Sequence, residues 1–166
     1  MILLTSGTAL YEDNDLLFLA KCARAAKERQ SGRKVFYTVN RHINLTNVCS
    51  SNCPLCAFQV EAGDKRGFVL ETADIDRMLA EAKQVKNLSE VHIVSALHPD
   101  RPFDYYVQVI RQVKTALPQV DVKAFTPVEI VNFAKMTGKS IREILLILQA
   151  AGLDSLPGGG AEILSD

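Results

Sequence analysis

Three of the four cysteines in this 166-residue chain lie close together in the sequence. Cys49, Cys53 and Cys56 are spaced as C-x3-C-x2-C. This arrangement is a poor disulfide framework, whereas thiolates on a compact loop bind metals and iron–sulfur clusters. A [4Fe–4S] cube normally has four protein ligands, so three thiolates leave one iron open to a small molecule. The spacing therefore predicts a [4Fe–4S] cluster with these three cysteines as its metal ligands.

Two other uses of these cysteines stay open. Cys53 and Cys56 alone form a C-x-x-C pair, which also occurs in thioredoxin-like redox motifs and as half of a zinc site. A thioredoxin-type pair does not need Cys49, and a zinc site needs a fourth ligand, for which only His42 lies nearby in the sequence. The remaining cysteine, Cys22, is expected to be a small buried residue of an N-terminal helix.

Predicted helices and strands alternate around the cysteine loop. Apolar periodicity predicts a helix over 13–30, and alternating β-branched and aromatic residues predict a first strand over 34–45 that leads into the loop. Further strands are predicted at 90–94, 120–125 and 155–156, with helices at 71–86, 104–117, 127–136 and 140–151 between them. Such alternation is typical of parallel βα units. We therefore expect an α/β fold, a partial (βα) barrel of about four parallel strands with covering helices.

The charge balance argues against two classes of partner. Lys+Arg and Asp+Glu are both 19, which gives a formal net charge of zero. Nucleic acids and anionic membranes both favour a basic face, so neither is expected as a partner. The chain has no signal-peptide pattern at its start and no apolar run of about 20 residues that could span a bilayer. We expect a soluble, cytoplasmic protein that acts on small molecules.

Two further residues are catalytic candidates because of where they lie relative to the predicted strands. His98 stands at the end of the second strand, and the active sites of βα barrels gather at the C-terminal ends of strands. It would contact substrate or exchange protons, with a structural turn histidine as the alternative. Glu129 follows the third strand across Thr126 and Pro127, and the alternative for this segment is a simple helix start that Thr126 caps.

Small and polar residues near the strand ends are candidates for cofactor binding. Three consecutive glycines after the last strand allow a ligand to approach closely, and the acidic Glu162 just beyond them could take ribose hydroxyls or a cationic group. The alternative for this segment is a flexible tail. Asn44 on the first strand is expected to form hydrogen bonds. Tyr37 on the same strand and Phe58 after the third cysteine are expected to pack in the core or against the cluster. The predicted cofactor-binding residues are Asn44, Phe58, Ser95, Ala96, Gly158, Gly159, Gly160 and Glu162.

The sequence around the cysteines resembles one branch of the radical S-adenosylmethionine (SAM) superfamily. The runs NRHINLTNVC at 40–49 and CAF at 56–58 are similar to the menaquinone and deazaflavin branch. The segments 91–100, 123–130 and 151–163 most resemble aminofutalosine synthases. In two places the chain departs from the pattern. Leu55 stands where the superfamily usually has an aromatic residue, and Ser95 and Ala96 stand where the family has two glycines that meet the methionine amino group.

This resemblance implies an activity. Aminofutalosine synthases are transferases that add the 5′-deoxyadenosyl radical of SAM to 3-[(1-carboxyvinyl)oxy]benzoate, which gives aminodeoxyfutalosine in menaquinone biosynthesis. The implied cofactors are a [4Fe–4S] cluster and SAM as cosubstrate, and the implied partner is an electron donor such as flavodoxin or ferredoxin. Dehypoxanthine futalosine cyclase and an FO synthase subunit are sibling activities that stay open.

The resemblance also implies a division of the chain. Residues 1–33 are expected to form a helical extension, and residues 34–166 the N-terminal half of a radical SAM barrel whose C-terminal strands are absent. We therefore expect that the chain alone binds a cluster poorly or turns over slowly, or that a second chain completes the barrel. A truncated, non-catalytic fragment that binds an iron–sulfur cluster or a metal is the alternative from another class.

Overall fold

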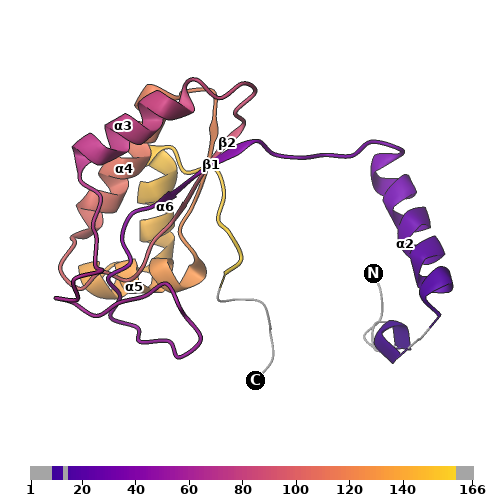
Figure 1. Ribbon diagram of the computed structural model, residues 1–166, viewed down its shortest axis with the longest axis horizontal. Coiled ribbons are helices and arrows are strands. Elements are labelled where there is room, and N and C mark those ends of the chain that lie inside the picture. The colour runs from indigo at the N-terminus through magenta and orange to yellow at the C-terminus, as the bar shows by residue number, and fades with distance from the viewer. Residues whose placement is uncertain (1–8, 13–14, 160–166) are drawn as a thin grey trace. The chain divides into compact units, whose positions relative to one another are not determined.

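The computed structural model describes residues 9–12 and 15–159. The chain divides into two compact units, Met1–Tyr37 and Thr38–Asp166, which are described separately (Figure 1). Two of the predicted site residues, Gly160 and Glu162, lie outside the described residues. No helix in the described part of the chain is long and apolar enough to cross a membrane.

The first unit contains helix α2 (Leu16–Ser31). Asp15 caps its start, since the Asp15 carboxylate accepts hydrogen bonds from the backbone N–H groups of Leu17 and Phe18. The helix ends at Gly32, whose φ of 59° suits a residue without a Cβ. None of its residues is buried, and Cys22 is exposed, so the expectation of a buried Cys22 is wrong.

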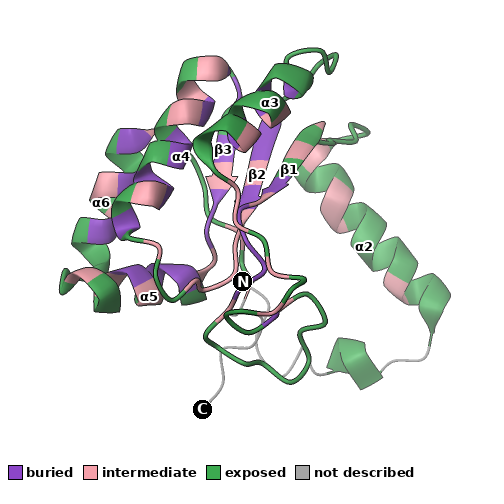
Figure 2. Ribbon diagram, turned by 60° about the vertical axis from the view of Figure 1, so that its left-hand side comes forward, coloured by how far each residue is buried: buried purple, intermediate pink, exposed green. Residues whose placement is uncertain are grey.

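The second unit is a three-stranded parallel sheet in the order β1-β2-β3. The strands are β1 (Asn40–Asn44), β2 (Glu90–Val94) and β3 (Asp121–Ala124). Helices α3 (Thr72–Ala82), α4 (Phe103–Ala116), α5 (Pro127–Thr137) and α6 (Ile141–Ala151) lie on one side of it (Figures 1 and 2). Because strand side chains alternate between faces, this covered face takes the apolar residues. They are Ile43, Val91, Ile93, Val122 and Ala124, all buried.

The opposite face of the sheet carries polar side chains. The rings of His42 and His92, which are register partners, stack with their centroids 5.0 Å apart. Next to them Lys123 Nζ lies 2.7 Å from Glu90 Oε2. Partial burial, together with the neighbouring His42, lowers the pKa of His92. The two faces therefore differ in chemistry as the period-2 pattern requires.

Two strand predictions need correction. The structure confirms the α/β fold with parallel strands, but the fourth strand at 155–156 is only a single parallel bridge between Lys123 and Ser155. Pro157 follows directly and has no N–H for a ladder. The first strand begins at Asn40, because β2 pairs with it only from Glu90 onward. Residues before Asn40 have no neighbouring strand, and Tyr37 is 80% exposed rather than packed in the core.

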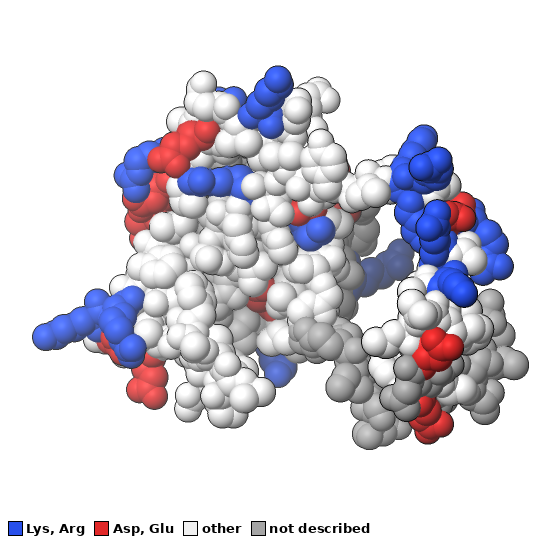
Figure 3. Space-filling view, turned by 45° about the vertical axis from the view of Figure 1, so that its right-hand side comes forward, with Lys and Arg blue, Asp and Glu red and all other residues white. Residues whose placement is uncertain are grey.

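The helix starts and stops follow local sequence signals. Helices α5 and α6 both begin with capping boxes, Thr126 with Glu129 and Ser140 with Glu143. They end at Gly138 and Gly152, whose φ angles of 70° and 113° belong to the left-handed region. On the surface of this unit seen in Figure 3, acidic and basic side chains lie interspersed, as expected from the zero net charge.

We predict that Ile93→Ala in the central strand lowers the free energy of unfolding by about 2–5 kcal/mol, because it leaves a cavity under the helices. Ile93 has no exposed surface. The matched control is Leu146→Ala on α6, where the side chain is 51% exposed and the change should stay within about 0.5 kcal/mol. Urea unfolding followed by circular dichroism measures both. Equal effects of the two substitutions would contradict the burial pattern.

Candidate functional site

A cavity of about 230 Å³ lies beyond the C-terminal ends of the three strands. Parallel strands all end at the same edge of a sheet, so the segments that follow them meet there. The cysteine loop comes from β1, the segment around Ser95 and Ala96 from β2, and the start of α5 from β3. The lining residues are Asn44, Cys49, Ser51, Cys53, Cys56, Phe58, Gln59, Val94, Ser95, Ala96, Leu97, Thr126, Val128 and Glu129.

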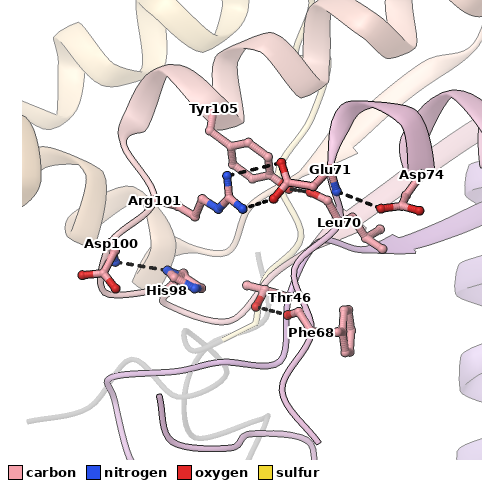
Figure 4. Close-up of polar contacts among 9 residues, drawn as sticks. All are labelled: Thr46, Phe68, Leu70, Glu71, Asp74, His98, Asp100, Arg101 and Tyr105. Atoms are coloured by element: carbon pink, nitrogen blue, oxygen red, sulfur yellow. Dashed lines mark hydrogen bonds and ion pairs between the residues drawn. The ribbon is translucent and has the colours of Figure 1, made fainter. Parts of the chain in front are cut away.

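Two buried polar residues between β1 and the cysteines hold the loop in place. The Thr46 hydroxyl donates to the Phe68 carbonyl at 2.6 Å (Figure 4). It also accepts from the Val48 N–H at 3.0 Å. The Asn47 amide donates to the Arg66 carbonyl at 3.1 Å, and its oxygen accepts from the Phe68 N–H at 2.9 Å. The two side chains thereby fasten both ends of the loop together. Neither side chain was predicted to belong to the site, although two polar residues directly after the predicted first strand are a signal that the sequence offers.

Backbone hydrogen bonds connect the cysteine loop to the segment after β2. The Ser50 N–H donates to the Leu97 carbonyl at 2.9 Å, and the Ser50 hydroxyl donates to the same oxygen at 3.1 Å. The Ala96 N–H donates to the Thr46 carbonyl at 3.2 Å. The two segments therefore form one wall of the cavity, and a shift of either one moves the other.

The three cysteines differ in exposure but share the cavity. Cys49 is half-buried, and Cys53 and Cys56 are exposed. The Ser51 N–H donates to Cys49 Sγ at 3.4 Å, and Ser51 Oγ lies 3.3 Å from Cys53 Sγ. Within residues 9–12 and 15–159, no three His, Cys, Asp or Glu side chains converge on one metal-ion position. The donor set, three free thiols on one loop lining one cavity, suits a cluster in which three of the four irons each take one thiolate.

Glu129 is a buried carboxylate in the wall of the cavity. It is 2% exposed and accepts three hydrogen bonds. The Ser95 N–H donates to Oε1 at 3.1 Å, and the Thr126 N–H and hydroxyl donate to Oε2 at 2.8 and 2.9 Å. Burial raises the pKa of Glu129 to about 7, and the hydrogen bonds oppose that rise. The hydroxyl of Thr126 thus caps α5, as expected for that residue.

The backbone next to this carboxylate is strained. Phe125, at the end of β3, has a φ of 61°, in the left-handed region that bulky residues rarely occupy. It is fully buried, and its N–H donates to the Ile93 carbonyl at 3.1 Å. Nearby, the Ser95 hydroxyl is buried and has no hydrogen-bond partner in the described residues. Strain and unpaired polar atoms concentrate at functional sites, and here both lie beside the cavity.

The structure places His98 outside the described lining of the cavity. Its Nδ1 accepts a hydrogen bond from the Asp100 N–H at 3.1 Å (Figure 4). Burial lowers the pKa of His98, so the ring is neutral at pH 7. With Nδ1 acting as acceptor, the single proton of the neutral ring sits on Nε2, which makes this nitrogen a hydrogen-bond donor.

Past His98, an ion pair fastens the segment to the chain that leads into α3. Arg101 pairs with Glu71, and its guanidinium lies 5.1 Å from the centre of the Tyr105 ring (Figure 4). The Tyr105 hydroxyl donates to the Leu70 carbonyl at 2.6 Å, and burial raises the pKa of Tyr105 to about 12. These contacts hold the end of the segment next to α4, and the backbone bonds of Ala96 and Leu97 hold its end next to β2.

Several predicted cofactor-binding residues come together at the cavity. Asn44, Ser95 and Ala96 line it, and so does Phe58, which is 46% exposed and packs edge-on against Phe68. Gly158 and Gly159 are not among its described lining residues, although a Cβ at Gly159 would lie 3.0 Å from Thr126 Cγ2. Sequence analysis did not assign several of the other lining residues to the site: Ser51, Gln59, Val94, Leu97 and Val128.

We predict that Glu129→Gln reduces the loss of stability with rising pH. The pKa of Glu129 is about 7 in the folded chain against 4.5 for the free side chain, so the folded state binds more protons between these values. Stability therefore falls as the pH rises from about 4.5 to about 7, by on the order of 3 kcal/mol at about 1.4 kcal/mol per pKa unit. Denaturant unfolding at several pH values measures this slope, and an unchanged slope in the variant would contradict the assignment.

The matched control for this prediction is Glu143→Gln on α6. Hydrogen bonds from Ser140 lower the pKa of Glu143, so its contribution to stability is present at neutral pH and is lost as the pH falls below the ordinary glutamate range. The two substitutions should therefore change the pH dependence of stability in opposite directions.

Comparison with known proteins places this arrangement in a family. No protein-family model matches the chain. Aminodeoxyfutalosine synthase of Streptomyces coelicolor is 45% identical over 157 residues, which are 95% of this chain and 40% of that protein. FO synthase of Nocardia farcinica is 43% identical over 135 residues, which are 81% of this chain and 16% of that protein. The chain thus spans less than half the length of these curated relatives.

A solved structure shows the same fold. Methylornithine synthase superposes with a TM-score of 0.63 over 93% of this chain and 54% of that one, at 12% sequence identity. At that identity the likeness concerns the fold alone. The resemblance identified from the cysteine loop and the later segments is confirmed by the two sequence relatives. The chain belongs to the branch of the radical SAM superfamily that contains aminodeoxyfutalosine synthase and FO synthase.

Proposed function

We propose that this chain is the cluster- and SAM-binding part of a radical SAM transferase of the aminodeoxyfutalosine synthase type. The observation that carries the proposal is the 45% identity to that enzyme, over a segment in which all three cysteines line one cavity at the strand ends. The proposed substrates are SAM and 3-[(1-carboxyvinyl)oxy]benzoate, and the proposed product is aminodeoxyfutalosine. Because the relatives are longer, we propose that residues 34–166 form the N-terminal half of the barrel.

In this proposal Cys49, Cys53 and Cys56 hold a [4Fe–4S] cluster. When bound, the cluster supplies the electron that cleaves a carbon–sulfur bond of SAM. The backbone of Ser95 and Ala96 forms the wall that faces the methionine part of SAM, and Asn44 offers an amide to it. The apolar side chains of the lining, Phe58, Val94, Leu97 and Val128, keep water away from the reacting atoms.

His98 is proposed to donate a hydrogen bond from Nε2 to a substrate oxygen. The support for this role is the hydrogen bond that Nδ1 accepts from the Asp100 N–H, which leaves the ring proton on Nε2. A neutral donor suits an anionic or carbonyl oxygen and does not take up a proton in the process. Gly158, Gly159, Gly160 and Glu162 remain predicted ligand-binding residues. A flavodoxin or ferredoxin is the proposed electron donor, and a second chain is a proposed partner that completes the barrel.

A sibling activity is the second candidate, favoured by the 43% identity to FO synthase. The two activities differ in the substrate that SAM meets. Anaerobic incubation with SAM, a reductant and each substrate in turn, followed by mass spectrometry of the products, distinguishes them. Formation of aminodeoxyfutalosine supports the first candidate, and formation of the deazaflavin product supports the second.

We predict that anaerobic reconstitution with iron and sulfide gives a reduced protein with a [4Fe–4S] electron paramagnetic resonance signal that changes when SAM is added. Replacing Cys49, Cys53 or Cys56 by Ala should remove roughly 90% of the signal or more. Each thiolate binds a different iron, so the loss of one leaves the cluster without one of its protein ligands. Cys22→Ala is the matched control and should retain the signal, since Cys22 lies on α2 in the other unit.

Three outcomes would contradict this proposal. A cysteine-to-alanine variant of the loop that keeps its full cluster signal would show that the cluster is not held there. Zinc bound in place of iron by the reconstituted protein would support the alternative of a metal-binding fragment. A cluster signal that does not respond to SAM would mean that this chain binds the cluster without its cosubstrate.

A further inference from the structure

The two carboxylate oxygens of Glu129 have different partners. Oε2 accepts both hydrogen bonds from Thr126 and closes the capping box of α5. Oε1 accepts a hydrogen bond from the Ser95 N–H, which belongs to the segment after β2, 34 positions earlier in the sequence. Glu129 is therefore a bridge between the ends of two neighbouring strands.

Helix α6 shows what the capping role requires by itself. Glu143 stands at the same capping-box position, and Ser140 donates two hydrogen bonds to its Oε2 at 2.8 and 2.7 Å. Within the described residues, neither oxygen of Glu143 accepts a hydrogen bond from another element, and the side chain is exposed. A capping carboxylate thus works at the surface. Capping alone does not explain why Glu129 is 2% exposed and faces the cavity.

The bond to Ser95 completes a set of restraints on one short backbone segment. The Ser95 N–H is held by Glu129, the Ala96 N–H by the Thr46 carbonyl, and the Leu97 carbonyl by Ser50. These contacts come from α5, from the end of β1 and from the cysteine loop. Ser95, Ala96 and Leu97 all line the cavity. Of the three restraints, the one from Glu129 is the only one in which a buried side chain is the acceptor.

We propose that Glu129 is a positioning residue, which fixes the Ser95–Ala96 backbone in the conformation that receives the ligand of the cavity. This inference rests on the proposed SAM-binding function. It assigns Glu129 a role through Ser95 in place of the catalytic role expected from the sequence. Glutamine cannot replace it, because an amide offers one oxygen to two backbone N–H groups and its NH₂ group must then face the other. Either orientation leaves one buried N–H unpaired.

The test compares the full chain with its Glu129→Gln and Glu143→Gln variants. Hydrogen exchange of the Ser95 amide, followed without any cofactor, reports the bridge directly. The dissociation constant of SAM, from the spectral change of the reconstituted protein, reports ligand binding. We expect Glu129→Gln to speed Ser95 exchange about tenfold and to weaken SAM binding by a similar factor. Glu143→Gln removes a capping carboxylate of the same kind and should change neither.

Each other outcome overturns the proposal. A Ser95 amide that exchanges freely in the unsubstituted chain shows that the bridge is absent, and this result does not depend on a variant that folds. Weaker SAM binding in Glu129→Gln without faster Ser95 exchange indicates direct contact with the ligand. Equal effects of both variants indicate a structural role only. Failure of the unsubstituted chain to bind a cluster or SAM contradicts the proposed function instead, while the exchange measurement still decides the bridge.

Discussion

The parallel register of β1, β2 and β3 brings three strand ends to one edge of the sheet, and the candidate site is built from the segments that follow them. Ile43 lies beside Ile93, and Ile93 beside Ala124. All three are fully buried under the helices, so a shift of one residue in any strand would turn its apolar side chains to the polar face. The cysteine loop, the Ser95 segment and the start of α5 are therefore aligned by the same packing that stabilises the core.

Buried polar groups are concentrated where these segments meet. Four polar or charged residues are buried in the described part of the chain: Thr46, Asn47, Glu90 and Glu129. Three of them lie at the strand ends beside the cavity, and each uses its side chain to hold backbone from another segment. A buried polar group is costly unless it is hydrogen-bonded, so this concentration gives the loops a defined shape at the expense of stability. The raised pKa of Glu129 has the same cause, because burial disfavours its charged form.

The two relatives described above carry different names. Identities of 45% and 43% to aminodeoxyfutalosine synthase and FO synthase show the branch, and both matches span less than half of the relative. The choice between sibling substrates therefore rests on the product assay, while the role of the three cysteines rests on the cluster signal and its loss in the variants.

The sequence by itself determined the features that depend on near neighbours. Thr126 and Ser140 accept hydrogen bonds from residues three positions onward, and Gly138 and Gly152 take up left-handed backbone, so the helix boundaries were predictable within a few residues. The central strands were predictable from their apolar residues. The cysteine spacing and flanking runs indicated the radical SAM family, which the relatives confirm.

Only the tertiary structure decided the features that depend on distant partners. The first strand starts at Asn40 because its neighbour starts at Glu90, and segment 155–156 makes a single bridge because Pro157 cannot extend a ladder. Cys22 and Tyr37 are exposed, whereas packing was expected for both. Glu129 was expected at the site from its place after the third strand, but its hydrogen bond with Ser95 exists only in the fold. Local hydrogen bonds are encoded within one helical turn, whereas pairing, burial and bridges between strand ends exist only once the chain has folded.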